Sequence, residues 1–465
     1  MEFMLEKVGV VNKSTIRLDG LTIICGTNNS GKSTAGKALY TTIESLSNLK
    51  EKLHKELLIN YRRVTILVSR VLDLASIAKY VDFPKIQKDK NKNFDVLLND
   101  NIYDFHIDPQ MENVVGSFID LKNTIEFLNQ DLLLEYAVKS KLRTLQMYLK
   151  NFDDNKRKAL SFIDKLNKYF DNEDILDFAE QNVAKLFYKE FNGQVFPINL
   201  KTNDRKSIFA ISKNGEEGCR FVVTDGKNIS AVVNSSKLFL NNAIYIDDPF
   251  ALDKLKRNDE YWFPQMFEEV SLTHTEKLLR ILLKKRSSSS IIEDSINQEN
   301  YAKVVNKISE IIPGSLSLKE GVIFYEEANK EPLRVENLAT GSKMFSIIKN
   351  LLEKGEINFD TMLILDEPEA HLHPEWQNIF AEIIVLIVKE FNTHILLTTH
   401  SPNFLMAIEA FVRKYNLEEK SNYYMVKRRD DGYMVDYECV NGNVSQIYSA
   451  FTKPLVEAKQ IKEDL

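Results

Sequence analysis

The sequence contains few cysteines, and their spacing excludes two kinds of small, cross-linked domain. Cys25, Cys219 and Cys439 are the only cysteines among 465 residues. They lie far apart and form no Cys-x-x-Cys pair, which excludes both a disulfide framework and a zinc site. This usage is typical of a protein of the reducing cytosol.

Long apolar runs and a one-sided charge are also missing. The longest apolar stretch, 379–388, is interrupted by Glu382 and is far shorter than the ~18 residues that a membrane span needs. The N-terminus has no basic segment followed by an apolar one, so no signal peptide is expected. The net charge is only −6, so no bulk basicity indicates a nucleic-acid coat. We therefore expect a cytoplasmic protein with no membrane partner.

Glycine is scarce as well, so its one tight cluster is informative. Gly26 and Gly31, two of only 16 glycines, frame the segment GTNNSGKST. This segment matches GxxxxGK[ST], follows an apolar strand expected at 21–25 and precedes a helical pattern, which is the context of a P-loop. Its backbone N–H groups would surround phosphates, Lys32 would reach the β- and γ-phosphates of ATP, and Ser33 would ligate Mg²⁺. The expected phosphate-binding residues are Gly26, Thr27, Asn28, Asn29, Ser30, Gly31, Lys32, Ser33 and Thr34.

A second apolar strand supplies the acidic groups that a P-loop requires. The strand expected at 361–365 is followed by Asp366 and Glu367. Asp366 is expected to bind Mg²⁺ through water, and Glu367 to polarise the attacking water. His400 ends a third expected strand, 394–398, where its imidazole could donate a hydrogen bond to the γ-phosphate. Because 334 residues separate Lys32 from Asp366, a large segment must be inserted between the two halves of one site.

Four motifs in this order resemble those of ABC-type ATPases. They are GTNNSGKST, LATGSK at 338–343, LILDEPEAHLHP at 363–374 and TTHSP at 398–402. The chain is most similar to the SMC-like, stand-alone bacterial AAA-family ATPases of anti-phage defence loci. The resemblance covers residues 1–45 and about 310–415 well, the β-region at 197–247 loosely and the helical insertion hardly at all.

The resemblance implies roles for residues that the motifs alone do not explain. Gly341 and Ser342 would stand in the signature loop that contacts the γ-phosphate held by another protomer, although ATGSK departs from LSGGQ. The segment 369–373 would be the D-loop at the same interface. No Gln stands at the Q-loop position, where Asp247 and Asp248 are the nearest candidates. His371 and His373 could alternatively be metal ligands, but they fit a D-loop or a helix start better.

The fold class follows from these motifs and from the hydrophobic periods between them. We expect an α/β fold, an ABC-type P-loop ATPase lobe with a mixed sheet and an antiparallel β-subdomain, split by a large helical insertion. The expected boundaries are an N-terminal part of the lobe at 1–45, the helical insertion at 46–194, the β-subdomain at 195–248, a second helical segment at 249–310 and the C-terminal part at 311–465.

Local patterns predict several elements inside these segments. Asp19-Gly20 predicts a hairpin turn between strands at 15–18 and 21–25. Apolar residues from Leu57 to Ala78 follow heptad spacing, and a second helical tract runs from Leu121 to Leu149 with a register shift near Glu135. The two tracts could pair as an antiparallel hairpin or pack as a compact helical bundle. The polar stretch 85–93 after Pro84 predicts a loop.

The favoured function is an ATP-dependent switch or scaffold. Two or more protomers would sandwich ATP and control a separately encoded effector, such as a nuclease, in anti-phage defence. The 65 residues after His400 leave too little room for a nuclease domain in this chain, and the degenerate signature argues against a transporter subunit. The alternative is an SMC-like repair or chromosome ATPase that clamps DNA, in which any nucleic-acid contact must be local.

Overall fold

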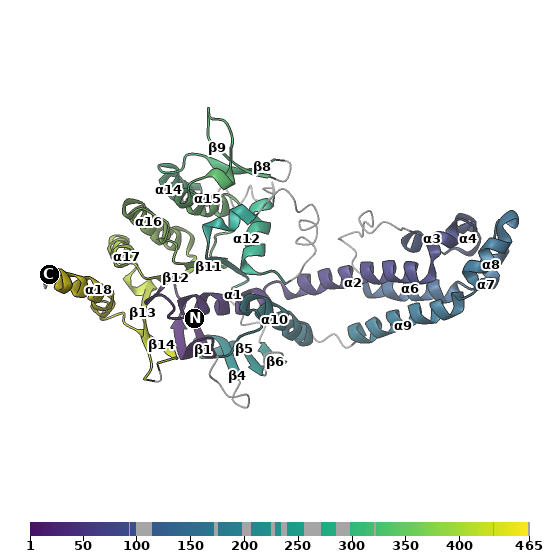
Figure 1. Ribbon diagram of the computed structural model, residues 1–465, viewed down its shortest axis with the longest axis horizontal. Helices are drawn as coiled ribbons and strands as arrows, with labels where there is room; N and C mark the ends of the chain where they lie inside the picture. The colour runs from purple at the N-terminus through teal and green to yellow at the C-terminus, as the bar shows by residue number, and fades with distance from the viewer. Residues whose placement is uncertain are drawn as a thin grey trace. The chain divides into compact units, whose positions relative to one another are not determined.

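The computed structural model covers the chain from Met1 to Leu465 (Figure 1). It describes residues 1–92, 94–98, 114–171, 175–197, 206–224, 228–233, 240–254, 271–284, 298–319, 322–430 and 432–463. The chain forms two compact units, which we call the larger unit (1–47 and 179–465) and the helical unit (48–178). The helical unit is shorter than the expected insertion at 46–194, because residues after 178 pack within the larger unit. Phe187, for example, lies with its ring 4.3 Å from that of Phe209.

An eleven-stranded mixed sheet forms the centre of the larger unit, with the strand order β6-β5-β4-β1-β2-β14-β13-β3-β12-β11-β7. Its antiparallel half comprises β1 (Glu2–Val8), β2 (Val11–Arg17), β4 (Lys206–Lys213), β5 (Glu216–Thr224) and β6 (Asn228–Val233). Strands β4, β5 and β6 form an antiparallel meander within the expected β-subdomain. They pair with the N-terminal hairpin through β1, so the β-subdomain continues into the main sheet.

The other half of the sheet is parallel. It comprises β13 (Ser421–Arg428), β3 (Leu21–Cys25), β12 (His394–Thr399), β11 (Thr361–Asp366) and β7 (Asn242–Ile246). Strand β14 (Val435–Cys439) pairs antiparallel with β13 and parallel with β2, which joins the two halves. Strand β7 therefore lies in the parallel half, although the sequence placed it in the β-subdomain at 195–248.

The hairpin predicted at Asp19-Gly20 is wrong. Strand β3 pairs in parallel with β12 and β13, and β2 pairs instead with β1. All five residues of β3 are buried, which is typical of a central parallel strand covered on both faces rather than of a half-exposed hairpin strand. Gly20 (φ 69°) turns the chain toward β12, and its carbonyl accepts the N–H of Ile395 at 2.8 Å.

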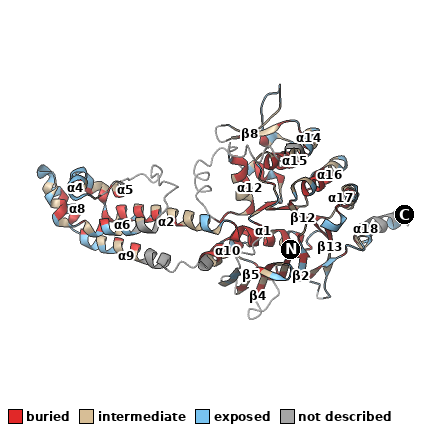
Figure 2. Cartoon of the chain, turned by 180° about the vertical axis from the view of Figure 1, so that it is seen from behind, coloured by how far each residue is buried: buried red, intermediate tan, exposed pale blue. Residues whose placement is uncertain are grey.

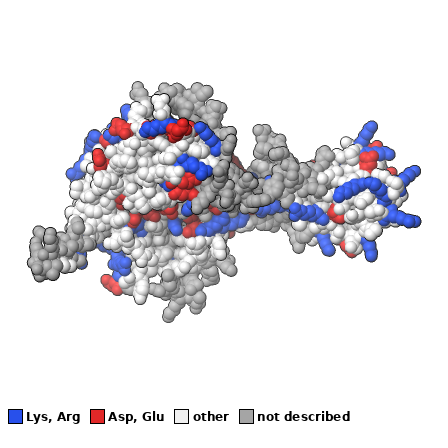
Figure 3. Space-filling model, turned by 45° about the horizontal axis from the view of Figure 1, so that its top comes forward, with Lys and Arg blue, Asp and Glu red and all other residues white. Residues whose placement is uncertain are grey.

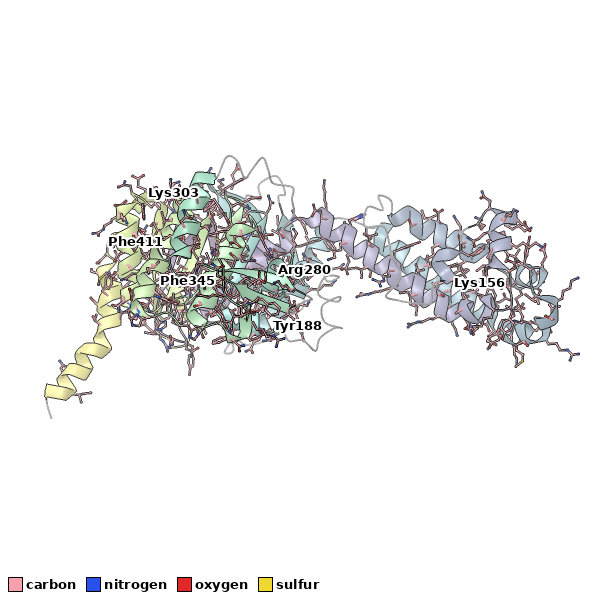
Figure 4. The ribbon with its side chains drawn as sticks, turned by 90° about the horizontal axis from the view of Figure 1, so that it is seen from above. Lys156, Tyr188, Arg280, Lys303, Phe345 and Phe411 are labelled. Atoms are coloured by element: carbon pink, nitrogen blue, oxygen red, sulfur yellow. The ribbon has the colours of Figure 1, made fainter. Side chains whose placement is uncertain are left out.

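Helices cover both faces of the parallel half (Figure 1). Helix α1 packs on one face, where Gly36 lies close to Ile364 and Tyr245. Leu363 and Leu365 point to the opposite face and share a core with the helices that follow β7. Phe345 lies in this core with its ring 5.2 Å from that of Phe380 (Figure 4). The helices of the larger unit are α1 (Lys32–Leu46), α12 (His274–Leu283), α14 (Gln298–Ser309), α15 (Thr340–Glu353), α16 (Pro374–Phe391), α17 (Pro402–Lys414) and α18 (Ser445–Glu463).

Smaller elements complete the larger unit. Helix α10 (Ile175–Phe191) begins in the helical unit and continues into the larger unit. A separate sheet pairs β8 (Ser315–Lys319), β9 (Val322–Glu326) and β10 (Leu333–Arg334). Asp248 caps a helix, because its carboxylate accepts the N–H of Phe250 at 2.8 Å, but this is only the short 3₁₀ helix η4 (Pro249–Lys254).

The helical unit is a bundle with its own buried core, which favours the second of the two predicted arrangements (Figure 2). The core joins Val64 of α2 to Ile125 of α6 and Ile163 of α9. The helices of this unit are α2 (Leu49–Leu72), α3 (Leu74–Ala78), α4 (Phe83–Lys90), α5 (Asp95–Leu98), α6 (Val114–Phe127), α7 (Gln130–Glu135), α8 (Leu142–Leu149) and α9 (Phe152–Asp171).

Two local predictions for the helical unit need correction. The heptad pattern holds only as far as Val68, because Asp73 adopts a left-handed conformation (φ 51°) and ends α2. The loop predicted at 85–93 is largely helix α4. Pro84 lies in the first turn of α4, where no backbone donor is needed, and Asp82 caps the helix by accepting the N–H of Lys85.

Among the described residues, no helix has the length and apolar character that a membrane crossing would require.

Candidate functional site

The sheet topology places four strand ends at one edge. Strands β3, β12, β11 and β7 are parallel, so their carboxyl ends meet there. In the ladder, Thr399 lies opposite Cys25, Thr398 opposite Asp366, and Leu365 opposite Ile246. The segments at these strand ends are therefore neighbours, although they are far apart in sequence. They contain the P-loop, Asp366, Glu367, His400 and Asp247.

The two glycines of the P-loop are required for different reasons. Gly31 adopts φ 83°, and a β-carbon there would lie 2.4 Å from the side chain of Val10. At Gly26, a β-carbon would lie 2.7 Å from the hydroxyl of Ser30 and 2.9 Å from Val426. The loop can therefore fold tightly between β3 and α1 only with glycine at both positions.

Lys32 is held inside the loop by three oxygen atoms. Its Nζ donates to the carbonyl oxygens of Gly26 at 2.9 Å and Thr27 at 2.8 Å. The same atom lies 2.9 Å from Oε1 of Glu367, and the side chain is only 4% exposed. A buried ammonium group needs such compensation, so Lys32 is positioned at the phosphate end of the loop with its charge satisfied by Glu367.

Glu367 connects Lys32 to His400. Its Oε2 lies 3.1 Å from Nδ1 of His400. Glu367 has a left-handed backbone conformation (φ 48°), which is uncommon for a residue with a side chain. Its N–H donates to the carbonyl oxygen of Thr398 at 3.1 Å and lies 3.0 Å from the hydroxyl. The strained turn therefore directs the carboxylate toward the P-loop, where it could accept a proton from water.

Two hydroxyl groups hold Asp366. Tyr245 donates to its Oδ2 at 3.1 Å, and Thr398 donates to its Oδ1. These bonds fix the carboxylate at the end of β11. Tyr245 and Thr398 carry no signal in the sequence, because only the strand register shows that they are neighbours of Asp366.

A pocket of about 430 Å³ lies in front of these groups. Most of the expected phosphate and metal residues line it, and Gly26, Thr27 and His400 do not. Gly26 is buried at the end of β3, Thr27 is exposed, and His400 adjoins the pocket through Glu367. We call this the phosphate pocket; its lining residues are Asn28, Asn29, Ser30, Gly31, Lys32, Ser33, Thr34, Asp247, Pro249, Met344, Asp366, Glu367, Pro368, Ala370 and His371.

Gly341 and Ser342 do not line the phosphate pocket of their own chain. They lie in the first turn of α15, whose backbone N–H groups have no partner within the helix. Gly341 is buried, and a β-carbon there would lie 3.1 Å from the ring of Trp376. Ser342 is half-buried. Glycine at 341 thus allows α15 to approach α16 closely.

In the segment 369–373, Glu369 and Leu372 are buried and the other three residues are exposed. Burial raises the pKa of Glu369, which accepts a hydrogen bond from the Thr399 hydroxyl. His371 and His373 are exposed, and Nδ1 of His373 accepts the N–H of Glu375 at the start of α16. Within the described residues, no three His, Cys, Asp or Glu side chains are grouped to hold a metal ion. His373 therefore has the helix-start role that the sequence analysis favoured.

A second pocket of about 570 Å³ shares Ser33 and Thr34 with the phosphate pocket. It lies beside the β1–β2 turn and the end of α10. Its lining is mainly apolar, with Glu190 and Lys37 as its charged groups. We call it the adjoining pocket; its lining residues are Gly9, Val10, Ser33, Thr34, Lys37, Glu190, Phe191, Asn192, Gln194, Phe196, Pro197, Tyr433 and Met434.

Comparison with known proteins matches most of the chain to one family. The family model described as the AAA ATPase domain matches residues 9–405. Among solved structures, the chain is similar to an SmcHead bound to the C-winged helix domain of ScpA, at 12% identity and a TM-score of 0.40, covering 96% of this chain and 98% of that one. It is also similar to the SMC head domain from Thermotoga maritima, at 12% identity and a TM-score of 0.34, covering 94% and 98%. These structural likenesses are distant.

Proposed function

The chain belongs to the AAA ATPase domain family, and on this premise we propose that it binds MgATP in the phosphate pocket and hydrolyses it. One observation supports this most: Lys32, Glu367 and His400 form a continuous set of contacts beside the P-loop. When the β- and γ-phosphates enter, they replace Glu367 as the partners of Lys32. Glu367 is then free to accept a proton from the attacking water, and His400 stays beside it to contact the γ-phosphate.

The residues expected to hold Mg²⁺ suit that ion. Ser33 is exposed at the start of α1, and Asp366 is fixed by Tyr245 and Thr398. Hydroxyl and carboxylate oxygens are the ligands that Mg²⁺ prefers. When bound, Mg²⁺ would neutralise negative charge on the phosphates. Tyr245 and Thr398 serve to keep Asp366 in one orientation.

The adjoining pocket supports a place for the rest of the nucleotide. Ser33 and Thr34 belong to both pockets, so a ligand whose phosphates lie in the P-loop extends past them. The apolar side chains of Val10, Phe196 and Met434 offer surfaces against which a base can pack. We place the nucleoside of ATP there.

The ATPase proposal is tested by phosphate release from purified protein. We expect hydrolysis that requires Mg²⁺ and stops with EDTA. Lys32→Met should abolish ATP binding and turnover, because the phosphates lose their cationic partner. Lys303→Met, which changes an exposed lysine of α14, is the charge-matched control and should leave the rate unchanged. Wild-type protein without Mg²⁺-dependent turnover would refute the proposal.

We also propose that two or more protomers enclose ATP and that the resulting assembly controls a separately encoded effector in anti-phage defence. The first turn of α15 supports the sandwich, because Gly341 and Ser342 present a helix N-terminus, which favours anions, outside their own phosphate pocket. The motif resemblance supports the defence role. Light scattering with and without ATP tests the assembly. A nuclease gene beside this one would favour the defence role, and a permease gene would contradict it.

A second candidate function, the binding of nucleic acid by an SMC-like ATPase, is favoured by the charge of the helical unit. Residues 79–90 and 136–150 contain eight Lys or Arg and two Asp, a local net charge of +6 in a chain whose net charge is −6. We call the eight cations the basic surface: Lys79, Lys85, Lys88, Lys90, Lys139, Lys141, Arg143 and Lys150, all exposed. Figure 3 shows Lys and Arg side chains gathered on this unit.

The two segments of the basic surface are joined by a short bridge. Val81 pairs with Ala137, and the N–H of Val138 donates to the carbonyl oxygen of Tyr80 at 2.9 Å. Among the described residues, no carboxylate forms an ion pair with any of the eight cations. Asp82 caps α4, and Asp89 accepts the hydroxyl of Tyr136. The charges are therefore available for a phosphate backbone, with the exposed Tyr148 beside them.

This candidate is tested by fluorescence anisotropy with a labelled 30-base-pair DNA of arbitrary sequence. We expect binding that weakens steeply with salt, and a loss of about tenfold or more in affinity when Lys139, Lys141, Arg143 and Lys150 are replaced by Ala. The control replaces Lys319, Lys330, Lys420 and Lys427 of the larger unit by Ala, an equal change in charge, and should bind normally. Equal loss in both variants, or tighter binding to poly-glutamate than to DNA, would contradict the candidate.

A further inference from the structure

A buried histidine lies between the two pockets. Nδ1 of His274 lies 2.7 Å from Oε2 of Glu190, and its Nε2 lies 3.0 Å from Oδ2 of Asp247. Asp247 lines the phosphate pocket and Glu190 lines the adjoining pocket. The imidazole ring therefore connects one carboxylate of each pocket.

The surroundings favour the charged form of this histidine. Burial alone lowers the pKa of His274, but Asp247 and Glu190 outweigh it and raise the pKa to about 9. The side chain of Glu190 is only 1% exposed, and His274 is its ion-pair partner. With both ring nitrogens protonated, the ring carries a positive charge that lies within ion-pair distance of both carboxylates, which a neutral ring does not.

The ring is also packed against residues near the reaction site. Its centroid lies 4.5 Å from that of Tyr245, which donates to Asp366, and 6.0 Å from that of Tyr40 in α1. The hydroxyl of Tyr40 donates to the carbonyl oxygen of Leu272 at 2.9 Å. These contacts fix the ring, and through it the position of Asp247.

Glu190 extends the connection to α10, the helix that leads back from the helical unit. Its Oε1 accepts the N–H of His274 at 2.6 Å, so one carboxylate binds both the backbone and the ring of His274. Earlier in α10, the side-chain amide of Asn182 donates to the carbonyl oxygen of Ser45 at the end of α1 and accepts a hydrogen bond from the Ser271 hydroxyl. Helix α10 is thus attached to the two elements that flank the pockets, α1 and the start of α12.

We propose that His274 is a positioning residue for ATP hydrolysis, which holds Asp247 at the phosphate pocket and couples that carboxylate to α10 through Glu190. The proposal rests on the ATPase function proposed above. Asp247 follows β7 directly beside Asp366, so a shift of Asp247 when the phosphates bind is passed through His274 to Glu190. The helix that carries Glu190 begins in the helical unit. A displacement of Glu190 caused by nucleotide binding can therefore be transmitted along α10 to that unit.

Steady-state kinetics and hydrogen exchange of the full chain test this role. In the wild-type protein, the non-hydrolysable analogue AMP-PNP with Mg²⁺ should change amide exchange in both the P-loop and residues 182–191. In His274→Gln, the change at 182–191 should be lost while that in the P-loop remains. We expect kcat to fall about tenfold or more with KM changed by less than about threefold, because the substrate still binds but the site is misplaced.

Asp247→Asn guards against loss of folding in the histidine variant. Its side chain is 34% exposed, so the replacement leaves no buried space empty. It should give the same two effects, and the double variant should be no worse than either single one, because both remove one interaction. Glu382→Gln is the matched control, since it removes the charge of a buried carboxylate paired with Lys307 and Lys414 away from the pockets.

The outcomes separate the possibilities. If both Asp247→Asn and His274→Gln keep the wild-type kcat and the exchange response at 182–191, His274 has only a structural role at the start of α12 and the inference is wrong. A wild-type protein that does not hydrolyse ATP would instead refute the proposed function, whatever the variants do. Loss of kcat in Glu382→Gln of the same size would also overturn the inference, because the effect would not be specific to this network.

Discussion

At the scale of single residues, the site depends on charges that neutralise one another before a ligand arrives. Lys32 and Glu367 form an ion pair at the P-loop, and His274 is enclosed by two carboxylates. Buried charges are costly unless they are paired, so each partner also holds the other in place. The P-loop could be located from sequence because its chemistry requires a fixed local spacing. The His274 network could not, because residues 190, 247 and 274 meet only in the folded chain.

Gly31→Ala should prevent nucleotide binding. A β-carbon at position 31 would lie 2.4 Å from Val10 and would force a side chain into φ 83°. We expect a loss of about 2 kcal/mol in stability and no measurable ATP binding by calorimetry. Gly215→Ala is the control, since it has a similar φ of 79° but no neighbour within 4 Å. ATP binding by the Gly31→Ala protein at wild-type affinity would show that the loop is not constrained in this way.

The stability contributed by His274 should depend on pH. Its pKa rises from the ordinary 6.5 to about 9 on folding, so its contribution is complete below about pH 6.5 and is lost as the pH rises through about 9. The wild-type protein should therefore unfold at a higher temperature than His274→Gln at pH 6.5, and the difference should shrink toward pH 10. The shift corresponds to roughly 3 kcal/mol. A difference that stays constant over this range would contradict a charged His274.

At the scale of helices and strands, predictions succeeded where the signal was local. Helix α16 has local signals at both ends, because Pro374 lies in its first turn and Asn392 (φ 51°) ends it. The Asp19-Gly20 hairpin failed, because β3 obtains its partners from residues more than 370 positions away. The loop predicted after Pro84 was wrong, because a proline occurs either where a helix ends or in the first turn of a new helix. Only the cap by Asp82 distinguishes these two cases.

Lys156 should stabilise the helical unit by capping α6. Its Nζ donates to the carbonyl oxygens of Glu126 at 2.7 Å and Leu128 at 2.6 Å, where α6 ends (Figure 4 labels Lys156). These carbonyl groups have no partner within the helix. We expect Lys156→Met to cost about 1 kcal/mol in chemical denaturation. The neighbouring Lys158→Met, at an exposed position, should cost nothing, and equal losses in both would argue against the cap.

At the scale of the whole molecule, the helical unit has a buried core that shares no residue with the core between the parallel strands and the helices after β7. The motifs predicted an ATPase lobe interrupted by a helical segment, since they stand on both sides of it. They could not show that the interruption has a core of its own, because that core is formed by contacts among α2, α6 and α9. Each unit is therefore expected to fold around buried residues of its own.

Residues 48–178 should fold without the rest of the chain. Among the residues that the structure describes, their buried core contains only side chains of this segment. We expect a helical circular dichroism spectrum and a cooperative thermal transition from the isolated segment. A spectrum without a cooperative transition would mean that the helical unit depends on the larger unit for its stability.

The central claim is that Glu367 activates water for ATP hydrolysis at the P-loop. The most direct test identifies the nucleotide that the Glu367→Gln variant holds after incubation with MgATP. The glutamine keeps the shape of the side chain but cannot accept the proton. We predict that the variant retains ATP and converts it to ADP at least about a hundredfold more slowly than the wild-type protein. If the variant instead yields bound ADP at the wild-type rate, Glu367 is not the catalytic base and the account is wrong.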